Sequence, residues 1–373
     1  MKMTKKILAV LLSLAMLAAF VPAVCAASGV EGVILWDYNT STRTLTISGN
    51  GRMNDYLTDE PAWSAYEDIA LYLVIEEGVK TIGDQAFIGF NHITTLTIPN
   101  GVKTIGAGAF QGCNQLSEVS FPDTLTSIGE RAFRYCSTLG SVKIPDSVTS
   151  IGRIAFEKCT WLESVKLSSN LEYLGVGAFV NCSSLKSVTI PGSVEVVNGV
   201  FTDCTALETV VLEPGVKTIG EQAFRGDTAL KNVTIPDTVT EIGEYAFLDT
   251  AIESIVIPDS VESIGVKAFC QCDELKTVYY TGSEEDWNNK SLGDGLVTYD
   301  PETGDDVPMD VEIVFNYGAE QPATPTEKEP SVCGYCGQVH DTTVVKEFFV
   351  SFLHTMLYIG KVFLSISTFG LFD

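Results

Sequence analysis

The residues with the most distinctive chemistry lie near the end of the chain, in the stretch CGYCGQVH. Cys333 and Cys336 form a C-x-x-C-G knuckle of the kind found in zinc ribbons, and His340 follows four residues after the second cysteine. A structural zinc ion takes four ligands, and His354 is a candidate for the fourth. The same thiols also suit a local disulfide or a redox-active dithiol. We expect a stapled junction here, that is, a crosslink within this short segment, formed either by a bound zinc ion or by a disulfide.

No catalytic constellation accompanies this cluster in the sequence. His92 falls in a loop between two apolar segments, no serine has a G-x-S-x-G context, and neither a phosphate-binding loop nor a zinc-protease motif is present. The acidic stretch from Asp300 to Asp310 lacks the ligand spacing of a calcium loop. We therefore predict that the protein is not an enzyme and requires no cofactor, apart from a structural zinc in its tail.

The first 26 residues predict secretion. Three lysines precede an apolar stretch at residues 7–20, and Val24, Cys25 and Ala26 lead into a small-residue cleavage point. This arrangement is typical of a secretory signal peptide. A lipoprotein signal would place a small residue before the cysteine, where a valine stands instead. The expected location is extracellular.

The acidic balance of the chain argues against one class of partner. The formal net charge is −25 at pH 7, and removal of the three lysines of the signal peptide leaves −28. Nucleic-acid backbones are bound by clustered Lys and Arg, so we expect no nucleic-acid partner. A strongly charged surface suits an extracellular protein that resists self-association.

The middle of the chain, residues 70–281, repeats one unit. Each copy carries a phenylalanine, preceded by alanine in all copies but one, and the spacing is always 22 or 23 residues. The phenylalanines are Phe87, Phe110, Phe133, Phe156, Phe179, Phe201, Phe224, Phe247 and Phe269. A fixed period of this length predicts a solenoid, in which each unit buries its apolar face by stacking on its neighbours.

Each unit predicts one short strand and a return segment. Val142-Lys143-Ile144 alternates apolar and polar residues, which indicates a strand with one inward face. A proline follows in most copies and ends the strand with a turn. The glycine of V-x-x-I-G then permits a sharp change of direction, and we expect the Ala-Phe segment to cross back as a short helical or 3₁₀ turn. The predicted fold has a parallel sheet on one face and short helical or irregular segments on the other.

The complete unit reads L-x-x-V-x-I-P-[DNG]-x-V-x-x-I-G-x-x-A-F-x-x-C and covers more than half of the chain. It resembles the leucine-rich repeats of BspA-like bacterial cell-surface proteins, and the segments at 45–56 and 278–289 look like that family's usual ends. Two copies depart from the pattern: Ser168 replaces the proline, and the copy at 194–201 is one residue short. The resemblance implies a leucine-rich-repeat solenoid at the bacterial surface that binds host extracellular or cell-surface proteins.

Six cysteines stand three residues after the phenylalanine: Cys113, Cys136, Cys159, Cys182, Cys204 and Cys272. Stacked coils would bring neighbouring ones within bridging distance, so disulfides are one alternative. Phe90 occupies the same register in another unit, which favours an apolar column of buried free thiols. Cys270 falls outside the register, and we expect it to be the accessible one.

The outward strand positions predict a ligand-binding face. An exposed sheet face is a usual binding surface of solenoids, although Ser and Thr also fit a solvated strand that binds nothing. The candidate residues are Ser141, Lys143, Ser164, Lys166, Thr209, Val211, Asn232, Thr234, Val256 and Tyr279.

These features divide the chain into six parts. We expect a signal peptide (1–26), an N-terminal cap (27–69), the solenoid (70–281), a C-terminal cap (282–316), a proline-rich extended linker (317–332) and a C-terminal region (333–373). Both caps are expected to be rich in β-strand.

The last segment, residues 344–373, predicts a helix with one narrow polar stripe. The stripe consists of Glu347, Ser351, His354, Tyr358, Lys361 and Ser365. A membrane span needs about 20 uninterrupted apolar residues, so a helix that lies on the membrane surface or envelope fits better. A tilted span and packing against the protein's own cap are alternatives.

Together these features predict a secreted, surface-associated adhesion or protein-binding module. Its partner would be a host or neighbouring-cell surface or matrix protein, or a glycan. A structural or self-assembling envelope spacer is the main alternative, followed by a thiol-redox protein that acts through Cys333 and Cys336.

Overall fold

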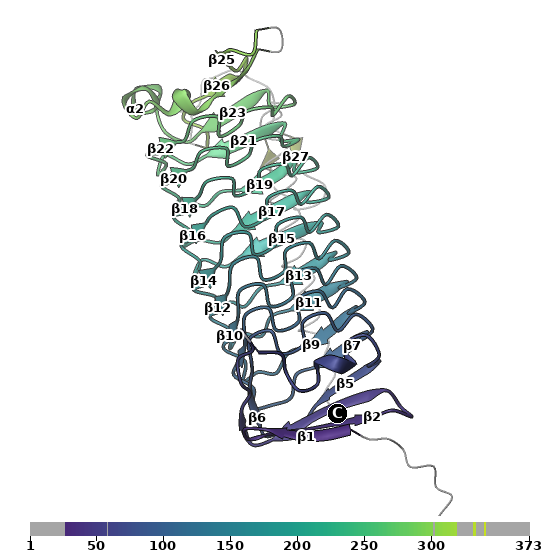
Figure 1. Ribbon diagram of the computed structural model, residues 1–373. Helices are drawn as coiled ribbons and strands as arrows, with labels where there is room; N and C mark the ends of the chain where they lie inside the picture. Colours follow the sequence, from purple (N-terminus) through teal and green to yellow (C-terminus); the bar gives the residue numbers. More distant parts are fainter. Residues whose placement is uncertain (1–26, 58, 301–302, 319–330, 333–338, 341–373) are drawn as a thin grey trace, which may run out of the picture. The chain divides into compact units, whose positions relative to one another are not determined.

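The computed structural model describes residues 27–57, 59–300, 303–318, 331–332 and 339–340. The chain divides into one compact unit that ends at Ala319 and a second that begins at Glu320. The first unit is an elongated parallel β-solenoid, in which successive coils of the chain stack along one axis (Figure 1). The leucine-rich-repeat solenoid expected from the repeats is therefore confirmed.

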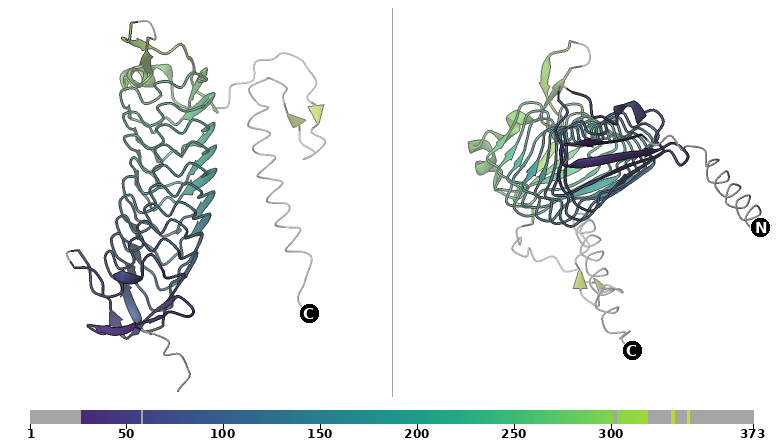
Figure 2. Two further views of the ribbon diagram at one scale, coloured as in Figure 1. Left: turned by 45° about the vertical axis from the view of Figure 1, so that its right-hand side comes forward. Right: turned by 60° about the horizontal axis from the view of Figure 1, so that its bottom comes forward.

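Two ladders of short parallel strands run along the solenoid, and each coil contributes one strand to each ladder (Figures 1 and 2). The first ladder consists of β5 (Tyr72–Ile75), β7 (Thr95–Thr97), β9 (Glu118–Ser120), β11 (Ser141–Lys143), β13 (Ser164–Lys166), β15 (Ser187–Ile190), β17 (Thr209–Leu212), β19 (Asn232–Thr234), β21 (Ser254–Ile257) and β23 (Thr277–Tyr280). The second consists of β4 (Gly51–Arg52), β6 (Val79–Ile82), β8 (Thr104–Ile105), β10 (Ser127–Ile128), β12 (Ser150–Ile151), β14 (Tyr173–Leu174), β16 (Val196–Val197), β18 (Thr218–Ile219), β20 (Glu241–Ile242) and β22 (Ser263–Ile264).

The repeat period sets the register of both ladders. Val142 lies opposite Val165 in the first ladder, and Ile128 lies opposite Ile151 in the second. Equivalent residues of successive coils therefore form columns along the solenoid. The strands of the first ladder pair in short runs, β7 with β9, β11 with β13, β15 to β19, and β21 with β23. The second ladder is interrupted only between β14 and β16, at the copy that is one residue short. The irregularity in the sequence thus appears as a local gap in pairing and leaves the fold unchanged.

The centre of the solenoid is a stack of phenylalanine rings. Centroids of successive rings lie 5.2 to 5.9 Å apart, with interplanar angles of 16° or less. All of these side chains are fully buried. Trp63 extends the stack at its N-terminal end, 5.8 Å from Phe87. Offset stacking is a preferred arrangement of aromatic rings, so the stack couples each coil to both of its neighbours.

The Ala-Phe segment crosses the core as a run of turns, which is an irregular segment of the kind expected on this side of the solenoid, and it does not continue as a helix. Phe133 N–H donates to the Ala155 carbonyl of the next coil at 2.8 Å, whereas Arg134 N–H donates back to the Arg131 carbonyl at 3.0 Å. Bonds between coils thus alternate with bonds within the turn. The cause is backbone geometry: in all nine coils, the residues two before and two after the phenylalanine have positive φ, as at Arg131 (φ 57°) and Tyr135 (φ 63°). A helix cannot continue through such left-handed residues.

An antiparallel three-stranded meander covers the N-terminal end. It consists of β1 (Ala27–Glu31), β2 (Ile34–Asn39) and β3 (Thr44–Gly49), and β3 pairs in parallel with β5. A 3₁₀ helix, η1 (Ser64–Tyr66), follows Trp63. The buried Trp63 indole N–H donates to the Ala86 carbonyl at 2.8 Å, which ties this end to the first coil.

Helical and strand elements cover the C-terminal end. They are α2 (Glu284–Asn289), the 3₁₀ helix η2 (Leu292–Gly295), β24 (Val297–Tyr299), β25 (Asp306–Pro308) and β26 (Glu312–Val314). The Ser283 side chain caps α2 by accepting the Asp286 N–H at 3.1 Å. Trp287 of α2 is buried, with its ring 5.1 Å from that of Tyr280. Strand β26 pairs in parallel with β23 and so covers the last edge of the first ladder.

The described part of the second unit is one short hairpin. Strands β27 (Ser331–Val332) and β28 (Val339–His340) pair antiparallel, with Ser331 opposite His340. The predicted ligands Cys333, Cys336 and His354, and the predicted helix at 344–373, lie outside the described residues.

Candidate ligand-binding face

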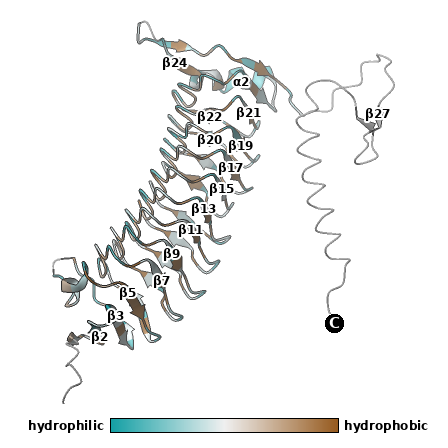
Figure 3. Ribbon diagram, turned by 90° about the vertical axis from the view of Figure 1, so that its right-hand side faces the viewer, coloured by the Kyte–Doolittle hydropathy of each residue, from teal (hydrophilic) through white to brown (hydrophobic). Residues whose placement is uncertain are grey.

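The first ladder presents one row of side chains to the core and another to solvent. In β11, Val142 is buried while Ser141 and Lys143 are exposed, and β7, β9 and β15 show the same alternation. The outward residues of β17 and β23 are partly buried. The alternation follows from the pleat of a β-strand, in which successive side chains point to opposite faces. We call the outward positions of β5 to β23 the ladder face. Figure 3 shows these strands following one another along the array.

The structure places all ten predicted residues on the ladder face. In strand register, Ser141 lies opposite Ser164 and Lys143 opposite Lys166. Further along, Thr209 lies opposite Asn232, Val211 opposite Thr234, and Val256 opposite Tyr279. The gap between these groups is filled by β15, whose outward residues Ser187 and Thr189 are also exposed. The face is therefore continuous between β11 and β23.

The C-terminal end of the face is less open than its middle. The ring of Tyr279 packs against that of Tyr317, with centroids 4.5 Å apart. Tyr279, Val256 and Val211 are all partly buried, whereas Lys143 and Lys166 are exposed. Tyr279 thus serves partly in packing at the C-terminal end.

Ion pairs mark the rim where each strand of the first ladder begins. Lys186 lies 3.0 Å from Glu163, and Lys231 lies 3.8 Å from Glu253. Each pair joins neighbouring coils, and all four side chains are more than half exposed. Such exposed pairs contribute about 0 to 1 kcal/mol each, so they shape the charge of the rim more than its stability.

Three exposed aromatic or aliphatic side chains near the face were missed in the sequence. Trp161 is 65% exposed just before β13, and Tyr72 and Val74 of β5 are 56% and 43% exposed at the N-terminal end. The signal was present in the repeat: Trp161 stands where other copies have Gln115, Thr138 or Ser184. A large aromatic residue at a position that is polar elsewhere indicates a role outside the core.

The six cysteines in the repeat register form a buried column of free thiols. Each thiol donates a hydrogen bond to the phenylalanine carbonyl of the preceding coil, as Cys136 does to Phe110 at 3.3 Å and Cys182 does to Phe156 at 3.3 Å. Burial raises the pKa of these thiols well above its ordinary value. The buried-thiol prediction is confirmed, and the alternative of disulfides within the array is not.

Cys270 is buried as well, and the expectation that it would be accessible was wrong. Its sulfur lies 3.8 Å from the Thr298 hydroxyl of β24, which also accepts the Gln271 N–H at 3.3 Å. The C-terminal cap therefore covers a position that would be open in an array without a cap.

Asp227 and Thr250 replace cysteine in the buried column. Oδ1 of Asp227 accepts the Cys204 N–H at 2.8 Å, while Oδ2 has no hydrogen-bond partner. Burial raises the pKa of this carboxyl well above its usual range, and the nearby charge of Asp203 adds to the increase. The core of the array thus contains one carboxyl group that folding favours in its neutral form.

The sequence of the repeat region identifies the family. Residues 80–208 and 195–293 match the model of the BspA type leucine rich repeat region, with six copies of the repeat. The chain belongs to the BspA-type leucine-rich repeat family. A comparison with curated protein sequences found no match.

Several solved structures have similar folds. A leucine-rich repeat protein from Bacteroides ovatus is 20% identical, with 77% of this chain and 90% of that chain covered and a TM-score of 0.44. The leucine rich repeat protein of T. pallidum is 23% identical, with 67% and 91% covered and a TM-score of 0.40. The pneumococcal vaccine antigen PcpA is 17% identical, with 78% and 85% covered and a TM-score of 0.43.

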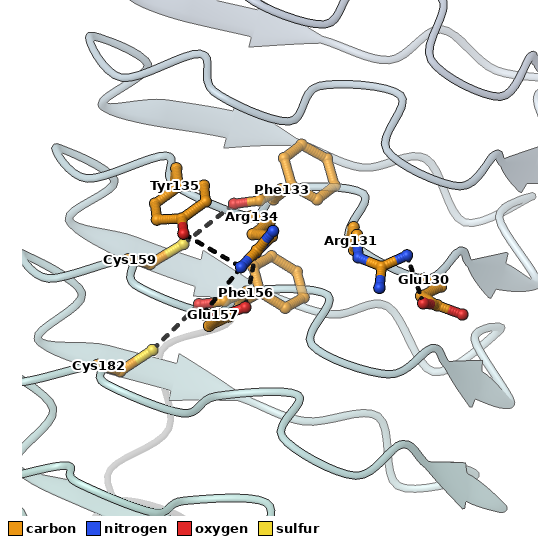
Figure 4. A network of polar contacts seen from close by, with 9 residues as sticks. All are labelled: Glu130, Arg131, Phe133, Arg134, Tyr135, Phe156, Glu157, Cys159 and Cys182. Carbon is orange, nitrogen blue, oxygen red and sulfur yellow. Dashed lines mark hydrogen bonds and ion pairs between the residues drawn. The ribbon is translucent and has the colours of Figure 1, made fainter. Parts of the chain in front are cut away.

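The BspA-type coils also carry a polar network on their turn side (Figure 4). Arg134 makes two hydrogen bonds to the Glu157 carboxylate of the next coil, from Nε at 2.6 Å and from Nη2 at 3.3 Å. Its guanidinium also lies 4.4 Å from the ring centre of Tyr135. The bond to Glu157 is the main reason that the pKa of Arg134 is raised. The network joins two neighbouring coils.

The described residues of this BspA-type chain contain no group of three or more His, Cys, Asp or Glu arranged to hold a metal ion. Asp300, at the start of the acidic stretch, accepts the Thr303 N–H at 3.0 Å through Oδ1. His92 lies within reach of Gln115, with Nδ1 and Nε2 3.4 Å apart. In the same described part of the chain, no helix has both the length and the apolar character required to cross a membrane.

Proposed function

We propose that this protein is a secreted, surface-associated module that binds a partner protein through its ladder face. The observation that carries the proposal is the row of outward side chains from β11 to β23, which is exposed in β11, β13, β15 and β19, is partly buried in β17 and β23, and stands on a largely buried core. A rigid face needs little ordering when a partner binds, which lowers the entropic cost of association. Membership of a repeat family whose fold presents extended surfaces supports the proposal.

Binding can be tested by obstructing the face with two bulky side chains. Thr189→Arg and Thr234→Arg place arginines on exposed positions of β15 and β19. Thr126→Arg and Thr240→Arg make the same chemical change at exposed positions beside the second ladder. All forms would be immobilised and exposed to a panel of extracellular matrix proteins and glycans. We expect the first double variant to lose binding and the second to keep it; equal binding by both would exclude the ladder face.

We propose further that residues 344–373 attach the protein to the cell envelope. The apolar composition and the single polar stripe of this segment support the proposal. The test compares the full chain with a form that ends at Asp341 in a bacterial host. Retention of the full chain on cells and release of the shorter form is the expected result, and equal release of both would contradict it.

The hairpin of β27 and β28 supports a stapled junction at the C-x-x-C. Ser331 pairs with His340, and both cysteines of the motif fall between these two residues in the sequence, which is compatible with shared ligation of a zinc ion by Cys333, Cys336, His340 and His354. The test is elemental analysis of the full chain purified with zinc and without chelator. One zinc per chain, lost in Cys333→Ser, is expected; absence of zinc together with a Cys333–Cys336 disulfide in mass spectrometry would favour the alternative.

A further inference from the structure

One part of the solenoid is basic although the protein as a whole is acidic. Residues 130–166 contain six basic and four acidic side chains, a net charge of +2, while the complete chain carries −25. Two of these basic residues, Lys143 and Lys166, lie on the ladder face. At physiological ionic strength, charges beyond about 8 Å are screened. A ligand at this point therefore experiences the local positive charge more than the distant carboxylates.

The two lysines are direct neighbours. They are register partners in β11 and β13, so about 4.8 Å separates their backbones. Like charges directly opposite each other on neighbouring strands are destabilising. In the part of the chain that the structure describes, neither ammonium group forms an ion pair. An anion between them would remove the repulsion.

Some other exposed lysines of the array have carboxylate partners on the neighbouring coil, whereas Lys80 and Lys103 have none among the described residues. Lys186 pairs with Glu163 at 3.0 Å, and Lys217 pairs with Glu195 at 2.6 Å. The repeat geometry therefore allows ion pairs between neighbouring coils, and such pairs form at these two places. At Lys143 and Lys166, the same geometry brings together two cations instead.

The carboxylate nearest to Lys166 in sequence, Glu163, pairs with Lys186, and the one nearest to Lys143, Asp146, is engaged in the turn that follows β11. It accepts the backbone N–H of Ser169 at 2.9 Å and the hydroxyl of the same serine at 3.0 Å. These hydrogen bonds are the main cause of its lowered pKa, and the charges of the two lysines contribute less. Asp146 thus adds some negative charge nearby without forming a bond to either ammonium group.

The surroundings suit a peptide. Ser141 and Ser164 lie beside the lysines on the same strands and are exposed. Trp161 is five residues from Lys166, so about 17 Å at most separates their backbones. Tryptophan is enriched among the residues that contribute most to protein–protein binding. An exposed tryptophan, two hydroxyl groups and a pair of cations therefore lie on two adjacent coils.

We propose that Lys143 and Lys166, with Ser141, Ser164 and Trp161, bind an acidic segment of a partner protein, in which an Asp or Glu carboxylate lies between the two ammonium groups. The proposal rests on the proposed function and specifies the chemistry of the partner. Charge-assisted hydrogen bonds of this kind are shorter and stronger than neutral ones, and here they also relieve the repulsion between the lysines.

The probe is a short labelled peptide of alternating Glu and Ser, with a Gln and Ser peptide as control. The full chain is compared with Lys143→Glu/Lys166→Glu and with Lys80→Glu/Lys103→Glu. Lys80 and Lys103 are also exposed neighbours on adjacent coils, but they lie beside the second ladder, where Lys103 N–H donates to the Lys80 carbonyl at 2.9 Å. The two double variants change the net charge equally.

Fluorescence anisotropy should show binding of the Glu peptide to the full chain and to the Lys80/Lys103 variant. We expect the Lys143/Lys166 variant to bind at least about tenfold more weakly, and Lys143→Arg/Lys166→Arg to retain binding. Trp161→Ala should weaken the same interaction. Thermal melting of each variant would verify that these exposed substitutions leave the fold intact.

Three results would overturn the inference: equal loss in both charge-reversal variants, equal binding of the Gln peptide, or binding of a sulfated polysaccharide at the lysines without binding of the Glu peptide. A partner from the matrix panel that binds Lys143→Glu/Lys166→Glu as well as the full chain would also contradict it. That last result would leave the proposed function intact, whereas a chain that binds no panel member would contradict the function itself.

Discussion

Asp227 makes stability depend on pH in a direction opposite to that of most carboxylates. Burial raises its pKa in the folded state, so above the ordinary carboxyl pKa the unfolded chain releases this proton while the folded chain keeps it. The contribution of Asp227 to stability is fully present below that pKa and decreases as pH rises, by at most about 1.4 kcal/mol per pH unit. Asp227→Asn cannot ionise at this position. The free energy of unfolding of the variant, relative to that of the wild type, should therefore increase as pH rises from 5 to 8.

The measurement is denaturant unfolding of both forms across this pH range. The exposed Asp237→Asn serves as the matched control, because it removes a carboxylate of the following coil without touching the core. The expected result is a stability difference for Asp227→Asn that increases with pH by more than the difference for Asp237→Asn. A difference for Asp227→Asn that stays constant over the range would show that this carboxyl is not neutral in the folded protein.

The backbone at Ile154 is strained, and a substitution can relieve this strain. It has φ of 47°, a left-handed conformation that is unfavourable for a β-branched side chain. Asparagine tolerates this region better, and Asn181 adopts it at φ of 60°. We expect Ile154→Asn to be more stable than the wild type by about 1 kcal/mol, measured as the free energy of unfolding. Ile154→Val keeps the branch and should show no gain; equal stability of the two variants would exclude backbone strain as the cause.

At the residue scale, the sequence predicted which residues align in columns along the solenoid, but it did not predict the residues that depart from the repeat. The cysteine column follows from the repeat register alone, because equal spacing places equivalent residues on one line. The burial of Cys270 could not be predicted in this way, since it depends on the Thr298 hydroxyl of a cap with no repeat pattern. Glycines at Gly108, Gly112 and Gly177 did indicate the left-handed positions, but only a comparison of all copies would have shown that every coil requires them.

At the scale of elements, the phenylalanine stack should be the main source of coupling between coils. Phe179 lies between Phe156 at 5.2 Å and Phe201 at 5.5 Å, and it is fully buried. Phe179→Ala removes contacts with both neighbours and leaves a cavity, so we expect a loss of about 3 to 5 kcal/mol. Phe179→Leu should lose less because it fills part of the space. Urea unfolding monitored by circular dichroism measures both; a loss below about 1 kcal/mol for the alanine variant would contradict a continuous stack.

The strands of the first ladder were predictable because three signals agree on them. The apolar alternation, the proline that follows and the fixed period all indicate the same short segment, as at Ser141–Lys143. The Ala-Phe turn was not predictable from composition, because residues such as Arg131 and Tyr135 have no local preference for positive φ. The turn is determined by hydrogen bonds to the next coil, such as that from Phe133 to Ala155, and those exist only in the assembled array.

At the scale of the whole molecule, the ends of the array should open before its middle. A coil in the middle contacts two neighbours, whereas a terminal coil depends on its cap and one neighbour. In partly denaturing urea, alkylation of Cys113 and Cys272 should therefore be faster than alkylation of Cys159 and Cys182, all of which are buried in the folded protein. Peptide mapping by mass spectrometry gives the four rates. Equal rates would mean that the array unfolds as one cooperative unit.

The register of the ladders has a consequence for how such a molecule can change its length. Each coil offers the next one the same residues at the same positions, as Ser127 does to Ser150 and Ile128 to Ile151. A duplicated coil inserted between them would find matching partners on both sides and would leave the cross-section and both caps unaltered. The number of repeat copies therefore sets the distance between the two ends of the solenoid in steps of one coil, and the packing of the interior stays the same.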